Sequence, residues 1–96
     1  MNYSFHPDAE LEFVKSIEYY EGCENGLGYD FALEVYDAIK RIIAYPNAWQ
    51  VLEENIRRSL VNRFPYGIIY VFENDEVLIL AIMHLHRNPD YWKSRS

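Results

Sequence analysis

Apolar residues recur at helical spacing in residues 7–22. Pro7 opens this segment, and its ring is preset for the first turn of a helix. The acids Asp8 and Glu10 complement the positive end of a helix dipole, and Gly22 is a suitable stop. The residues of the apolar stripe are Leu11, Phe13, Val14, Ile17 and Tyr20. The pattern predicts a first helix that buries one face.

A second helical pattern covers residues 27–45 and ends at Pro46, which cannot continue a helix. Its apolar stripe consists of Phe31, Val35, Ala38, Ile39 and Ile42. The linker between the two patterns, residues 24–28, is short. Short linkers join neighbouring antiparallel helices, so the two helices are expected to form a hairpin.

From Ile56 the apolar period changes to two, which is typical of strands. We expect strands over residues 56–64, 67–73 and 76–86, with a turn at Pro65 and a hairpin turn at Asn74-Asp75. The last strand is apolar almost throughout, which indicates a strand covered on both faces. Residues 2–5 fit a short first strand, and residues 46–55 fit a loop with Trp49 against the core.

The order is therefore strand, two helices and three antiparallel strands. This pattern predicts an α+β fold, β-α-α-β-β-β, with a helical hairpin packed on an antiparallel sheet. The 96 residues fit one domain, 1–96.

Charge is distributed unevenly along this acidic chain, whose net charge is −6. Residues 1–56 hold eleven acids and three bases, whereas residues 57–96 hold four acids and six bases. An anionic partner is therefore expected to meet the second half. The single cysteine, Cys23, excludes an internal disulfide framework, and we expect it to be a small buried apolar residue. Without a signal-peptide pattern or a membrane-length apolar run, a soluble cytoplasmic protein is the simplest expectation.

The segment HLHRNPDYW (84–92) concentrates reactive side chains at the end of the last strand. His84 and His86 are two apart, so on a strand they share a face, in line with Leu78, Leu80 and Ile82. Two imidazoles could offer two ligands to a metal, with Asp90 or His6 as a third. Zinc sites use three or four protein ligands, so we expect no metal and no cofactor. The alternative is simply the polar end of a strand that leaves the core.

Arginines surround this segment in the predicted fold. Arg87 follows the last strand, and Arg57, Arg58 and Arg63 belong to a strand that could neighbour it. With Tyr66, Tyr91 and Trp92 they could form a basic, aromatic patch that suits phosphate or carboxylate groups. The alternative is that these arginines solvate the surface or pair with the acidic helices.

Metal-free cleavage of RNA requires a base, cations that stabilise the phosphorane, and an acid for the leaving oxygen. His84 or His86 could act as the base, and Tyr66 or Tyr91 as the acid. Arg87 with Arg58 or Arg63 could supply the cations. The sequence has no nucleophile motif and no glycine-rich phosphate loop.

Two segments, RFPYGIIY (63–70) and AIMHLHRNPDYW (81–92), resemble the RelE/ParE superfamily of toxins from type II toxin–antitoxin and plasmid-stabilisation modules. The resemblance extends over nearly the whole chain. It implies two helices on an antiparallel sheet and a cognate antitoxin that wraps the toxin in a heterocomplex. RelE-like members cut mRNA on the ribosome, whereas ParE-like members inhibit DNA gyrase.

Within this resemblance, Arg87 matches the arginine that follows the last strand in both branches. Gly67 stands where RNA-cutting members commonly carry an arginine, and the chain has only three lysines. A protein that docks on ribosomal RNA gains affinity from counterion release, which an acidic chain does poorly. The resemblance therefore favours a ParE-like gyrase inhibitor that is not an enzyme.

Two alternatives remain: a ribosome-dependent mRNA endonuclease, or a degenerate homologue that is not toxic. The endonuclease would use Arg87, His84, His86, Tyr91 and Arg63. For a gyrase inhibitor, the residues expected to contact target or antitoxin are Arg58, Arg63, Tyr66, His86, Arg87, Tyr91 and Trp92.

Overall fold

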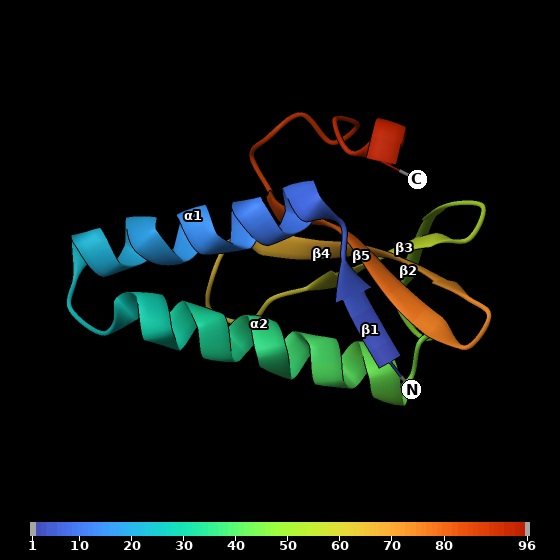
Figure 1. The fold of residues 1–96 in the computed structure, drawn as a ribbon, viewed down its shortest axis with the longest axis horizontal. Helices are drawn as coiled ribbons and strands as arrows, with labels where there is room; N and C mark the ends of the chain where they lie inside the picture. The colour runs from blue at the N-terminus through green and yellow to red at the C-terminus, as the bar shows by residue number, and fades with distance from the viewer. Residues whose placement is uncertain (1, 96) are drawn as a thin grey trace.

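The computed structural model describes residues 2–95, which form two helices, a five-stranded sheet and a C-terminal segment (Figure 1). Along the chain the elements are β1 (Asn2–Phe5), α1 (Pro7–Cys23), α2 (Leu27–Ala44), β2 (Gln50–Glu53), β3 (Ile56–Leu60), β4 (Tyr66–Glu73), β5 (Glu76–His84) and a short 3-10 helix, Lys93–Arg95. The α+β class and the helical hairpin on a sheet are confirmed.

The strands are arranged in the order β1-β5-β4-β3-β2. Strands β3, β4 and β5 are antiparallel, as predicted. Strand β2 also pairs antiparallel with β3, whereas β1 pairs in parallel with β5 and makes the sheet mixed. The turn at Asn74-Asp75 is confirmed: both residues have positive φ, 53° and 63°, which suits the tight turn of a hairpin.

Strand β2 lies where the sequence predicted only a loop. Gln50 and Val51 pair with β3, and a two-residue turn at Glu54-Asn55 joins the two strands. Glu54 has a φ of 45°, a conformation that glutamate seldom adopts, so a tight turn was not expected at this residue. The pairing with β3 overrides this local preference.

Helix α1 begins where Pro7 predicted it, and the preceding residue caps it. The N–H of Asp8 donates to Nδ1 of His6 (3.1 Å), so an imidazole replaces the usual hydroxyl or carboxylate cap. At the other end of α1, the Glu21 carboxylate accepts from the N–H groups of Gly26 (2.9 Å) and Gly28 (3.1 Å). Glu21 thereby connects the end of α1 to the start of α2.

Apolar side chains form one layer on each face of the sheet. The larger layer lies between the helices and the sheet, and Trp49 packs against it, as predicted. The smaller layer lies on the other face, where the C-terminal segment brings Trp92 onto β3, β4 and β5; its buried members are Ile56, Ile69, Val71, Leu80, Ala81, Met83 and Trp92. Strand β5 is therefore covered on both faces, as predicted. Cys23, expected to be buried, is exposed because it ends α1 away from both layers.

Replacing Gly28 with alanine should destabilise the helical hairpin. A Cβ at this position would lie 2.5 Å from the carbonyl oxygen of Ile17 and 2.9 Å from Cβ of Glu21, so the helices would have to separate. We expect a loss of about 1–3 kcal/mol in the free energy of unfolding, measured by urea denaturation. Gly22→Ala is the matched control, because a Cβ there meets nothing within 4 Å and favours the helix. Equal stability of the two variants would contradict the close approach.

Candidate functional site

Strand β5 continues beyond the end of its partner β1. The pairing stops at Phe5 and Ile79, and the N–H of His6 donates the last backbone bond to the Ile79 carbonyl (2.8 Å) before the chain enters α1. The next backbone groups on this edge of β5 are satisfied by side chains instead. Glu12 of α1 accepts from the N–H of Ile82 (3.1 Å), and Arg95 donates to the carbonyl of Leu80 (3.0 Å). Polar side chains thus replace a strand partner.

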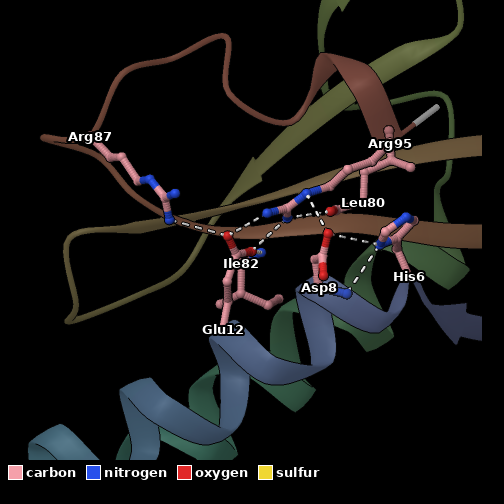
Figure 2. Close-up of polar contacts among 7 residues, drawn as sticks. All are labelled: His6, Asp8, Glu12, Leu80, Ile82, Arg87 and Arg95. Carbon is pink, nitrogen blue, oxygen red and sulfur yellow. Dashed lines mark hydrogen bonds and ion pairs between the residues drawn. The ribbon is translucent and has the colours of Figure 1, made fainter.

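The Glu12 carboxylate also accepts from two arginines of the C-terminal segment, as Figure 2 shows. Arg95 donates through Nη1 to Oε1 (3.0 Å) and through Nη2 to Oε2 (3.1 Å), which is a two-point contact. Arg87 donates through Nη1 to Oε2 (3.3 Å). We call these three residues the Glu12 latch. Glu12 and Arg95 are mostly buried, with 14% and 12% of their side chains exposed, whereas Arg87 is 53% exposed.

The Tyr91 ring stacks with both arginines of the latch. The guanidinium carbon of Arg87 lies 3.6 Å from the ring centroid, and that of Arg95 lies 4.9 Å away. Burial, and after it the neighbouring Glu12 carboxylate, raises the pKa of Tyr91 well above its ordinary value. A tyrosine in this setting keeps its proton at neutral pH and is held by packing, so it is poorly placed to exchange that proton with a substrate.

His84 and His86 lie together, with ring centroids 5.2 Å apart. His84 also contacts Tyr66 edge to face (5.1 Å), and its Nδ1 accepts from the N–H of His86 (3.1 Å). The predicted line with Leu78 and Leu80, however, is wrong. The pairing of β4 with β5 shifts register between Ile69 and Tyr70, which leaves Leu80 as an extra residue and reverses the alternation beyond it.

The predicted arginine cluster does not form, because β4 lies between β3 and β5. Arg87 is held by α1 in the Glu12 latch. Arg63 lies beyond β3, where it pairs with Asp30 of α2 (3.7 Å). Arg57 donates to the carbonyls of Asn47 (3.0 Å) and Trp49 (2.9 Å).

The remaining arginine of the predicted patch, Arg58, lines one hollow together with Trp92 and Lys93 of the C-terminal segment and a second one beside α2. It donates to Oε1 of Gln50 (2.7 Å). A Cβ added at Gly67 would lie 3.1 Å from Cδ of Arg58. The aliphatic part of the Arg58 side chain therefore packs directly over Gly67.

The aromatic residues of the predicted patch are mainly structural in this fold. Trp92 is 2% exposed and Tyr66 is 8% exposed. A binding role for Arg58, Arg63, Tyr66, His86, Arg87, Tyr91 and Trp92 stays a prediction, but only some of these side chains reach the surface.

Two residues that organise the site, Glu12 and Arg95, were not predicted from the sequence. Glu12 was one of many acids in the first half, and Arg95 is the penultimate residue. The patterns along the chain could not have paired them, because these residues lie 83 positions apart.

Neither the family models nor the curated proteins include a match to this chain. Among solved structures, a chain described as "Chromosomal ParDE TA system from P. aeruginosa" superposes with a TM-score of 0.74. The alignment covers 90% of this chain and 97% of that chain, at 15% sequence identity. This chain has the ParDE chain's fold. At this identity the ParDE likeness establishes the fold alone.

Two further properties concern residues 2–95. No helix in this range is long and apolar enough to cross a membrane. The same range contains no group of three or more His, Cys, Asp or Glu side chains that could hold a metal ion. His84 and His86 are therefore without a third ligand in the described part of the chain.

Proposed function

We propose that this chain is the toxin of a type II toxin–antitoxin module, acts by binding rather than catalysis, and inhibits DNA gyrase until an antitoxin neutralises it. The observation that carries the proposal is the likeness to the ParDE chain over 90% of the sequence. The segments RFPYGIIY and AIMHLHRNPDYW, which resemble ParE-like toxins, support it.

The geometry of the site favours binding over RNA cleavage. A metal-free ribonuclease needs a base, free cations and an acid that converge on one phosphate. Here Arg87 is paired with Glu12, Arg63 is paired with Asp30, and Tyr91 packs against two guanidinium groups. The half-exposed side chain of Arg87, which follows His86 in the sequence, is better suited to contact with a protein surface than to RNA cleavage.

Induction of the protein alone in bacterial cells tests the proposal. Gyrase inhibition predicts DNA breaks and filamentation while incorporation of labelled amino acids continues. It also predicts that the purified protein blocks supercoiling by purified gyrase, and that the product of the adjacent gene restores supercoiling. Rapid arrest of translation with cleaved transcripts would support the mRNA endonuclease instead. Normal growth with abundant folded protein would contradict both toxic activities.

Arg87→Ala should reduce gyrase inhibition at least about tenfold, because it removes the exposed cation of the site. Its cost in stability should be about 1 kcal/mol or less, since its ion pair is half exposed. The measurements are the concentration that halves supercoiling and the urea midpoint. Lys40→Ala removes a positive charge from an exposed pair on α2 and should leave inhibition unchanged. An unfolded Arg87→Ala protein would indicate a structural role for Arg87.

A further inference from the structure

Two arginines from different elements line one hollow beside strands β2 and β3. Arg41 belongs to the last turn of α2, and Arg58 belongs to β3. The hollow has a volume of about 310 Å³. Its other lining residues are Trp49, Gln50, Leu60 and Asn62.

Neither arginine has a carboxylate partner among residues 2–95, although the chain contains 15 acids and only nine lysines and arginines. Arg58 donates to the neutral amide of Gln50, and its Nε is buried without any hydrogen-bond partner in this range. By contrast, the guanidinium groups of Arg63, Arg87 and Arg95 all pair with acids. The hollow is thus a local positive site on an acidic protein.

Arg41 and Arg58 both line this hollow, and two positive charges beside one hollow favour the binding of an anion there. Planar guanidinium groups bind oxyanions through two parallel hydrogen bonds. The wall beside them is apolar, because Leu60 is 53% exposed and Trp49 is only partly buried. The hollow therefore suits an oxyanion that is carried next to an apolar group.

We propose that this hollow binds an acidic side chain of a partner protein, with an apolar side chain of the same segment against Leu60 and Trp49. A protein carboxylate fits better than nucleic acid, because a net charge of −6 repels a polyanion while one or two carboxylates need only a local cation pair. The inference goes beyond the proposed function, since it concerns the chemistry of a contact and not the target's identity.

Titration of the ¹⁵N-labelled protein with the capped peptide acetyl-Glu-Leu-Glu-amide tests this inference, with the arginine Nε–Hε signals as the readout. We expect saturable shifts of the Arg41 and Arg58 signals, and little response to acetyl-Gln-Leu-Gln-amide. Arg41→Gln should weaken peptide binding at least about threefold, the range of one exposed charge pair. Lys15→Gln removes the same charge from an exposed position of α1 and should leave the affinity unchanged.

The outcomes that would overturn the inference are equally specific. One is an equal response to the two peptides; another is the absence of saturable shifts. Tighter binding of inorganic phosphate or an eight-nucleotide uridine strand would make the hollow a phosphate site. Arg58 is partly buried, so the Arg58→Gln variant tests peptide binding only if its thermal midpoint matches that of the parent protein. If the midpoints differ, Arg41→Gln alone tests the inference. Gyrase inhibition is not read in this experiment, so its result is independent of the proposed function.

Discussion

Trp92→Ala should lower the free energy of unfolding by about 3–5 kcal/mol, the largest single effect that we expect. The indole is 2% exposed and packs in the layer that covers the far face of the sheet, with Leu80 and Met83. Alanine would leave a cavity there and would loosen the C-terminal segment that carries Arg95. Urea denaturation followed by circular dichroism measures the loss.

The control for this prediction is Tyr29→Ala, which truncates an aromatic ring that is 67% exposed on α2. Its cost should be about 0.5 kcal/mol or less. If Trp92→Ala lost gyrase inhibition at unchanged stability, Trp92 would act by contacting the target rather than by packing. That result would restore the binding role that the sequence suggested for this tryptophan.

The elements that the sequence predicted well are those whose signal is local. The apolar stripe of α2 has residues such as Phe31 and Ile42, and all of these are buried as their spacing indicates. The turn at Asn74-Asp75 needs positive φ at both positions, which asparagine and aspartate tolerate. Each of these features depends on residues a few positions apart, so one sequence is enough to find it.

The features that the sequence missed depend on partners elsewhere in the sheet. Strand β2 exists because β3 pairs with it, although its turn places Glu54 in a conformation that local rules disfavour. The extra residue at Leu80 is a property of the pairing between β4 and β5 and leaves no mark in an apolar run. Strict alternation therefore placed His84 incorrectly on the same face of the sheet as Leu78 and Leu80.

The same distinction holds for the candidate site. His84 and His86 are close, but not as neighbours on one strand face, because β5 ends at His84 and the N–H of His86 donates back to His84 from the turn that follows. The place of Arg87 just after the last strand was predicted from the sequence. The partner of Arg87 was not, because Glu12 lies 75 positions away on α1. Charge counts indicated that acids predominate in the first half of the chain and bases in the second, but only the fold shows which acid meets which base.

Glu12→Gln should lower the free energy of unfolding by about 3 kcal/mol, because it removes the negative charge from a mostly buried pair and leaves Arg95 with only its longer contact to the exposed Asp8 (3.8 Å). Glutamine keeps the size of the side chain and can still accept the N–H of Ile82, so the loss reports charge rather than packing. Urea denaturation at neutral pH and low salt measures it.

Glu10→Gln is the matched control, since Glu10 is an exposed acid on the same helix, and we expect it to cost about 0.5 kcal/mol or less. A double-mutant cycle with Arg95→Gln separates the pair from its surroundings. If Glu12 and Arg95 stabilise the fold as a pair, the double variant should be clearly more stable than the sum of the two single losses predicts. The reason is that neither charge is then left buried alone. Strictly additive losses would mean that Glu12 and Arg95 each stabilise the fold through other contacts, such as the bond from Arg95 to the Leu80 carbonyl. In that case breaking the contact between Glu12 and Arg95 would carry no free-energy cost of its own.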